Sequence, residues 1–342
     1  MIELILHPGH SKCGSTTIQD FLYTNRLVLK DRGIFMPDSD FNFPGNKAYR
    51  INRTHTPRDF IEKVINGELN INALEKKIDD FLITAEEQGC KKVIITAENL
   101  VNAIGSPQLK AIHSLFATRF SNVKVVYYIR DQRELLLSAW QQWGHKKGET
   151  IDAYIDRMIN TNFGDYVFVT EQLSNYYPNA ELKVCSLDKK HLIKSNLTID
   201  FCTRAGINNN GLKPSLEASN AGLSSAICES LTKIHTIYES PHTQKVKNTI
   251  LAFAPNSKKL ISKKYSVKLP FELENKISSR YLESNKKLEQ TYYLGKHAFP
   301  SSLNKSNSES DNEISLLKQR IEKLEDIVSI QMDMILTIVG KK

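Results

Sequence analysis

Long apolar runs and cysteines are both scarce in this sequence of 342 residues. No apolar stretch reaches the length of a membrane span, and the first residues lack the basic start and apolar core of a secretory signal. We therefore expect the protein to reside in the cytosol. The cysteines are odd in number, widely separated and without a C-x-x-C pair, which excludes a disulfide framework and a thiolate zinc site. We predict free thiols at Cys13, Cys90, Cys185, Cys202 and Cys228.

Signatures of nucleic-acid binding are also missing from the sequence. It contains no zinc-finger spacing and no aromatic-rich ribonucleoprotein motif, so we predict no nucleic-acid partner. The net charge is nevertheless +8, which favours anionic partners such as a phosphorylated nucleotide, an acidic glycan or a lipid head group. A solvated lysine-rich face is the simpler explanation of this charge. Many of the lysines lie late in the chain, for example Lys258, Lys259, Lys263, Lys264 and Lys268.

What the sequence does contain is a distinctive amino-terminal stretch. Residues 2–6 form a short apolar run typical of a buried strand, and helical spacing of apolar residues resumes at Ile18, Phe21 and Leu22. The loop between them is rich in glycine and hydroxyl residues. Small residues let backbone N–H groups approach a ligand at the amino end of a helix, so this loop is suited to bind an anion such as a phosphate.

The position of Lys12 distinguishes this loop from that of a magnesium-dependent NTPase. In the NTPase motif GxxxxGKS or GxxxxGKT, the lysine directly precedes the hydroxyl residue that holds magnesium. Here Lys12 comes first, and Ser15-Thr16-Thr17 follow after Cys13 and Gly14. This order resembles the 5′-phosphosulfate loop of sulfotransferases that use 3′-phosphoadenosine 5′-phosphosulfate (PAPS), in which Thr commonly stands at the position of Cys13. The resemblance implies that the donor is bound by Lys12, Cys13, Gly14, Ser15, Thr16 and Thr17.

The loop allows two other interpretations. It can be a strand-to-helix turn that binds nothing, although the order of its residues disfavours this. It can also be a cysteine phosphatase loop with Cys13 as the nucleophile, but that chemistry needs an arginine six residues later, where this chain has Gln19. The residues that follow, Ile18-Gln19-x-Phe21-Leu22, are similar to the bacterial, carbohydrate-type branch of the sulfotransferases.

A second informative stretch lies around Arg130. Residues 123–129 are a nearly continuous β-branched and aromatic run, typical of a central parallel strand, and a helix is predicted from about Gln132. Arg130 closes the strand and Ser138 follows eight residues later. This pair resembles the 3′-phosphate site of PAPS-dependent sulfotransferases, in which a guanidinium gives charge-assisted hydrogen bonds and a hydroxyl adds another. A structural ion pair of Arg130 is the alternative.

Two residues are candidates for the general base. Glu98 follows the predicted strand at 92–96, and a carboxylate at the carboxyl end of a parallel strand projects toward the same crevice as the first loop. Bacterial sulfotransferases often read Ser-x-Glu-Asn-Leu at this point. His55, in the loop-rich stretch 35–57, is the second candidate because the pKa of histidine lies near working pH. Glu98 can instead be a helix-dipole carboxylate, and His55 an ordinary surface histidine.

The pattern of elements predicts an α/β fold: a P-loop-like, doubly wound parallel sheet with helices on both faces. Residues 58–88 show helical spacing in two segments separated near Gly67, and a further strand is predicted at 181–185. The segment Ser284-Asn285-x-x-Leu288 is similar to the end of bacterial sulfotransferase domains. We therefore assign residues 1–299 to a sulfotransferase domain.

The last residues have a different pattern. Residues 300–312 are small and polar and predict a linker. In residues 313–342, Ile314, Ile321, Val328 and Ile335 recur every seven residues, as do Leu317, Leu324, Gln331 and Ile338. β-Branched residues at one core position and mainly Leu at the other favour a parallel two-stranded coiled coil, and Arg320 and Glu325 occupy flanking positions. We predict a homo-oligomer through this helix. The alternative is an amphipathic helix in peripheral contact with the inner face of a membrane.

Together these features predict a PAPS-dependent sulfotransferase that acts on a hydroxyl, or in second place an amine, of a carbohydrate or glycan. As the resemblance implies, Lys12 neutralises charge on the donor, the hydroxyl residues hold its 5′-phosphate, and Arg130 with Ser138 holds its 3′-phosphate. Glu98 or His55 takes the acceptor proton. No magnesium site is apparent, so we predict no metal. The alternatives are an ATP-dependent P-loop kinase of a small molecule and a non-catalytic nucleotide-binding assembly protein.

Overall fold

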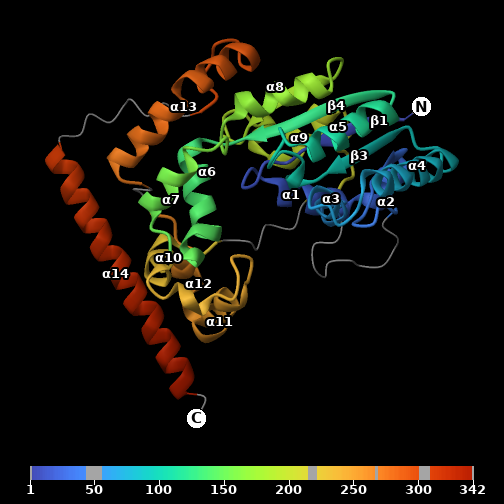
Figure 1. Cartoon of the computed structure of the whole chain (residues 1–342). Coiled ribbons are helices and arrows are strands. Elements are labelled where there is room, and N and C mark those ends of the chain that lie inside the picture. The colour runs from blue at the N-terminus through green and yellow to red at the C-terminus, as the bar shows by residue number, and fades with distance from the viewer. Residues whose placement is uncertain (1, 44–55, 215–221, 266–268, 300–308, 341–342) are drawn as a thin grey trace. The chain divides into compact units, whose positions relative to one another are not determined.

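A computed structural model describes residues 2–43, 56–214, 222–265, 269–299 and 309–340 of the chain (Figure 1). The chain divides into two compact units, each made of separate segments. Unit 1 comprises Met1–Arg130, Asp165–Ala218 and Ser284–Phe299, and unit 2 comprises Asp131–Gly164, Ser219–Glu283 and Pro300–Lys342. The predicted domain boundaries at residues 299 and 312 stay a prediction.

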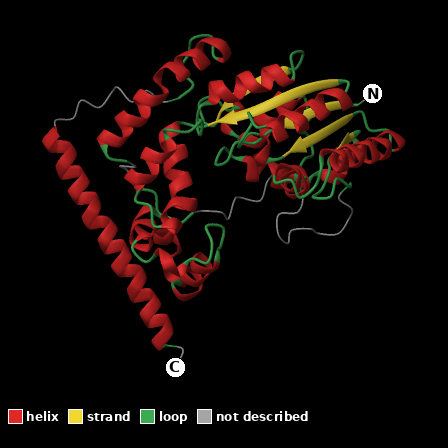
Figure 2. Cartoon of the chain, in the orientation of Figure 1, coloured by secondary structure: helices red, strands yellow, loops and turns green. Residues whose placement is uncertain are grey.

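Unit 1 is built on a five-stranded sheet in which every pairing is parallel (Figure 2). Its strands are β1 (Glu3–His7), β2 (Ile34–Phe35), β3 (Lys92–Thr96), β4 (Asn122–Ile129) and β5 (Glu181–Ser186). The strand order is β2-β3-β1-β4-β5, so β1 lies between β3 and β4. Apolar residues of β1 such as Leu4 and Ile5 are fully buried, as the continuous apolar run requires. The sheet, with helices packed around it, confirms the predicted α/β fold.

Seven whole helices and the second half of α13 (Phe271–Tyr292) accompany the sheet in the described part of unit 1, besides short 3₁₀ turns. Two of them, α3 and α4, confirm the two helical segments predicted on either side of Gly67. The side chain of Asn70 accepts a hydrogen bond from the backbone of Ala73 and thereby caps α4. The helices are α1 (Ser15–Thr24), α2 (Arg26–Asp31), α3 (Arg58–Ile65), α4 (Ile71–Glu87), α5 (Pro107–Arg119), α8 (Tyr166–Tyr176) and α9 (Leu197–Ala205).

The described residues of unit 2 form helices and the loops between them, with no strand. After α6 (Gln132–Ala139) the chain continues as one π-helical turn, Trp140–Gly144. The other helices are α7 (Ile151–Met158), α10 (Ser225–Thr232), α11 (Lys245–Phe253), α12 (Lys258–Ile261) and α14 (Glu309–Val339), and α13 (Phe271–Tyr292) contributes its first half. Helix α14 begins inside the stretch predicted as a linker.

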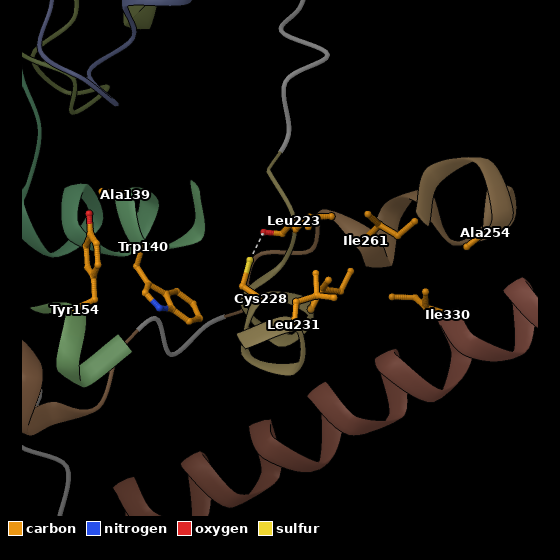
Figure 3. Close-up of a cluster of buried hydrophobic side chains, with 10 residues drawn as sticks. Ala139, Trp140, Tyr154, Leu223, Cys228, Leu231, Ala254, Ile261 and Ile330 are labelled. Carbon is orange, nitrogen blue, oxygen red and sulfur yellow. Dashed lines mark hydrogen bonds between the residues drawn. The ribbon is translucent and has the colours of Figure 1, made fainter. Parts of the chain in front are cut away.

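A hydrophobic cluster joins α14 to the rest of unit 2 (Figure 3). Trp140, Leu231, Ala254 and Ile261 form its buried centre, and Ile330 of α14 packs against it with only 5% of its surface exposed. Burying such side chains stabilises a fold by about 1.5–3 kcal/mol each. Helix α14 is therefore docked on its own unit through at least part of its surface.

None of the described helices combines the length with the apolar character needed to cross a lipid bilayer. All five cysteines are free and buried.

Candidate active site

The loop between β1 and α1 turns sharply at two left-handed residues. Lys12 and Gly14 have φ values of 66° and 79°, and Gly14 is the residue that precedes the first turn of α1. The left-handed conformation is costly for most residues but not for glycine. The Cys13 N–H donates to the carbonyl of His10 at 3.0 Å and the Thr17 N–H to that of Gly14 at 3.1 Å. Because Gly14 has no side chain to cap α1, the amino end of this helix is suited to an anion.

Close packing also fixes the start of the loop. A Cβ atom added at Gly9 would lie 2.9 Å from Cβ of Ser15 and 3.7 Å from Cγ of Glu98. The backbone at residue 9 therefore lies directly against the first residue of α1 and the side chain of Glu98. Any residue larger than glycine at this position would therefore have to shift Ser15, whereas Glu98 would stay at an ordinary contact distance.

The two strands beside β1 bring charged residues to the same edge of the sheet. β3 and β4 both pair with β1 in parallel, so their carboxyl ends meet the loop from either side. Glu98, just after β3, accepts a hydrogen bond from the hydroxyl of Ser15. Arg130, just after β4, donates from Nη1 to the carbonyl oxygen of Lys12 at 3.3 Å. The structure thus gathers Lys12, Ser15, Glu98 and Arg130 around one loop.

The pKa of the buried Cys13 thiol depends on the charges around it. Burial raises the pKa of Cys13 to about 12, while Arg130 and Lys12 act to lower this pKa and Glu98 acts to raise it. A thiol with this pKa is protonated at neutral pH and is a poor nucleophile. This agrees with the exclusion of a phosphatase loop, and it places two cations and a carboxylate within electrostatic reach of one atom.

The part of the sequence that forms this sheet also matches a known protein family. A family model described as the sulfotransferase domain matches residues 5–184, which is more than half of the chain. The chain belongs to the sulfotransferase domain family. No curated protein matches it. Members of the family are PAPS-dependent enzymes, so the predicted family and enzyme class are confirmed. The bacterial carbohydrate-type branch stays a prediction.

In this sulfotransferase the backbone of Arg130 is held by Tyr166, a residue that the sequence did not point to. The Tyr166 hydroxyl donates to the carbonyl oxygen of Arg130 at 2.5 Å and accepts from its N–H at 3.2 Å. Tyr166 is the first residue of α8 and is 1% exposed. Tyr166 lies 36 residues after Arg130, and no motif has this spacing, so the sequence alone could not predict the contact.

A second group of residues that the sequence did not point to lies at the carboxyl end of β1. His7 Nδ1 is 2.7 Å from Oγ1 of Thr96, and the same Oγ1 accepts from Nε2 of Gln19 at 3.4 Å. Burial lowers the pKa of His7 to about 3, so its ring is neutral at physiological pH. This chain of hydrogen bonds ties β1, β3 and α1 together at the point where the loop begins. The polar residue His7 at the end of the apolar run is a feature of the sequence that could have indicated this group.

The other predicted site residues lie in different places. Thr16 and Thr17 are partly exposed in the first turn of α1. Ser138 lies on α6, which belongs to unit 2. His55 lies outside the described residues.

The part of the chain that the structure describes holds no cluster of three or more His, Cys, Asp or Glu side chains able to bind a metal ion. The predicted independence of metal stays a prediction. The loop instead offers donors suited to a phosphorylated ligand, namely cationic side chains, hydroxyls and the amino end of a helix.

Proposed function

We propose that this sulfotransferase takes PAPS as its donor and transfers the sulfuryl group to a hydroxyl of a carbohydrate. The observation that carries the donor assignment is the contact of the Arg130 guanidinium with the Lys12 carbonyl, because it puts the two predicted phosphate-binding elements at one edge of the sheet. The family match supports the same donor, since its members use PAPS. When bound, PAPS supplies a sulfuryl group on a phosphate oxygen.

The residues of the loop have separate tasks in this proposal. The ammonium of Lys12 neutralises negative charge at the 5′-phosphate end of the donor, where charge grows during transfer. The first N–H groups of α1 and the hydroxyls of Ser15, Thr16 and Thr17 hold that phosphate. Arg130, with its backbone fixed by Tyr166, presents a planar pair of donors to the 3′-phosphate. The role of Ser138 at this phosphate is carried over from the family resemblance alone.

Glu98 is the base that the geometry favours. Its carboxylate accepts the hydrogen bond of Ser15, and Ser15 belongs to the phosphate-binding loop. The carboxylate therefore lies beside the place where the sulfuryl group would be presented, and it can take the proton of an incoming hydroxyl. His55 stays the alternative.

The acceptor class rests on the resemblance to the bacterial branch. An amine of a glycan is the second candidate, because the same base would remove its proton.

Binding of 3′-phosphoadenosine 5′-phosphate, the donor without its sulfuryl group, tests the donor assignment. At a hundred times its Kd this nucleotide should stabilise the protein by about 2.7 kcal/mol and raise the melting temperature. Arg130→Ala should weaken its affinity about tenfold to a hundredfold, since a charged hydrogen bond contributes about 1.5–3 kcal/mol. Lys110→Ala, an exposed lysine of α5, is the control and should leave the shift unchanged.

Two outcomes would contradict the proposal. One is an unchanged melting curve in the presence of the bisphosphonucleotide. The other is a larger stabilisation by ATP with Mg²⁺, which would instead support a kinase.

A further inference from the structure

Helix α14 uses one face to dock on unit 2. Asp326 accepts hydrogen bonds from Nζ of Lys263 at 2.7 Å and from the hydroxyl of Tyr265 at 2.8 Å. One turn later Ile330 enters the hydrophobic cluster, on the side that faces Ala254 and Ile261 (Figure 3). These positions are four residues apart, so they lie on the same side of the helix.

The docking face continues in both directions along the helix. Lys323 donates to Glu229 at 2.6 Å, and Asp333 accepts from the backbone N–H groups of Asn256 and Ser257 at 3.0 Å each. The docking face is therefore mixed: these polar groups have partners within unit 2, and Ile327, Ile330 and Met334 pack on its hydrophobic cluster.

The heptad residues predicted to form a coiled coil lie on another face, which we call the seam. It consists of two rows of side chains, each repeating every seven residues. The seven apolar members are all 47–60% exposed on the single chain, and Gln331 is exposed as well. The rows are Ile314, Ile321, Val328 and Ile335, and Leu317, Leu324, Gln331 and Ile338.

The heptad explains why the docking face leaves the seam open. With Ile314, Ile321, Val328 and Ile335 at position a and the other row at position d, Asp326 and Asp333 both fall at position f. Position f lies diametrically opposite the a/d seam of a coiled-coil helix. Docking on unit 2 therefore turns the seam outward.

We propose that a second copy of this chain covers the seam and that the two copies of α14 form a parallel two-stranded coiled coil. β-Branched residues at a with mainly Leu at d favour two parallel strands. Charge supports the same arrangement. In a parallel coil, Arg320 at position g of one copy meets Glu325 at position e of the other, and both are exposed on the single chain.

The seam fits a second helix better than a membrane surface. Its two apolar rows repeat every 3.5 residues on average, as the core of a coiled coil does, although Leu316, Met332, Leu336 and Val339 are also exposed outside the rows. Its flanks carry both signs of charge, with Lys318 and Arg320 near Glu325, where a helix that lies on an anionic surface would carry mainly basic residues. A hydrophobic face of this size, left open, would also promote aggregation.

Sedimentation equilibrium of the full chain tests the proposal. The protein should have twice the 38.9 kDa mass of one chain. Leu324→Asp puts a charge into the seam and should make it monomeric, with at least a hundredfold loss in association. Leu336→Asp is the matched control, because Leu336 is equally exposed, at 64% against 60%, but lies at position b, on the outer side of the helix away from the seam. The control should stay dimeric.

Cross-linking tests the parallel arrangement. In a parallel coil in register, each residue at position a faces its own counterpart, so Ile314→Cys should form an interchain disulfide on mild oxidation. In an antiparallel coil the two copies of residue 314 would lie near opposite ends of a helix about 45 Å long, and no disulfide would form. The native thiols are buried, so they should contribute little background.

Several results would overturn the proposal. A monomeric wild-type chain would do so, as would a dimer that survives Leu324→Asp. A monomer that sediments with vesicles of anionic lipid would show that the seam binds membranes. A dimer in which Ile314→Cys stays reduced would exclude the parallel arrangement.

Discussion

At the scale of single residues, Glu98 and His55 are the two side chains that compete for the role of general base. Replacing Glu98 by Gln keeps an oxygen that accepts the hydrogen bond of Ser15 but removes the group that can take a proton. We expect Glu98→Gln to lower kcat about 10²–10⁴-fold, with the affinity for the bisphosphonucleotide nearly unchanged. Steady-state kinetics and nucleotide titration measure the two quantities. His55→Gln is the companion variant and should retain most of the activity; the reverse pattern would assign the base to His55.

Gly9 is a residue whose small size, not its φ value, matters. A Cβ atom there would approach Cβ of Ser15 to 2.9 Å, and Ser15 carries both a phosphate-binding hydroxyl and the bond to Glu98. We expect Gly9→Ala to destabilise the protein by about 1–3 kcal/mol and to weaken nucleotide binding. Urea unfolding and titration check both effects.

Gly222→Ala is the matched control for this change. An added Cβ at Gly222 meets no atom within 4 Å, so the variant should be neutral or slightly stabilising. Equal effects of the two substitutions would show that the packing at Gly9 does not shape the loop.

At the scale of elements, the docking of α14 depends on a buried carboxylate. Asp326 is 8% exposed, and its removal leaves the Tyr265 hydroxyl, also buried, without this acceptor. We expect Asp326→Ala to weaken the docking by about 1–3 kcal/mol, because a buried polar group loses its partner. Hydrogen exchange of residues 309–339 should then become faster. Ser329→Ala, an exposed residue of the same helix, should leave the exchange rates unchanged.

The elements show which parts of the fold the sequence could specify. Residues 92–96 were predicted as a strand and form β3 with these bounds, because four apolar or β-branched residues follow Lys92 between clear breaks. β2 was missed, since a strand of two residues has no periodicity to detect. The π-helical turn at Trp140–Gly144 was missed as well, because the spacing of its apolar residues fits an ordinary helix.

The residues of the candidate site also divide into those that the sequence could predict and those that it could not. The loop around Lys12 and the residues that end β3 and β4 have local signals, and the rule for parallel strands brings them together. The bond of Tyr166 to Arg130 has no such signal, because it depends on where α8 packs after the chain has passed through unit 2. Tertiary contacts of this kind follow only from the folded structure.

At the scale of the whole molecule, buried neutral histidines make stability depend on pH. Burial lowers the pKa of His7 to about 3 and the pKa values of His113 and His145 to about 4. In the unfolded chain these groups bind protons near pH 6.5. Between that pH and the folded pKa values, the unfolded state binds more protons, so stability falls as the pH falls. Burial also lowers the pKa of His10, so with four such groups the free energy of unfolding changes by up to about 5 kcal/mol per pH unit.

Urea unfolding between pH 7 and pH 5 measures this dependence. His113→Gln removes one of the four groups and should reduce the slope by about a quarter, whereas His242→Gln, at an exposed position, should leave it unchanged. A stability that stays constant over this range would contradict the assignment of buried neutral rings.

The interleaving of the two units has a consequence for synthesis on the ribosome. Unit 1 receives its final segment, Ser284–Phe299, only after most of unit 2 has been made, and unit 2 is completed by α14 at the end of the chain. At about 5–20 residues per second, roughly 15–60 s pass between the synthesis of β1 and that of Ser284–Phe299, the last segment of the same unit. Neither unit can complete its fold until Ser284–Phe299 and α14 have been synthesised, so nascent chains should need protection by chaperones until then.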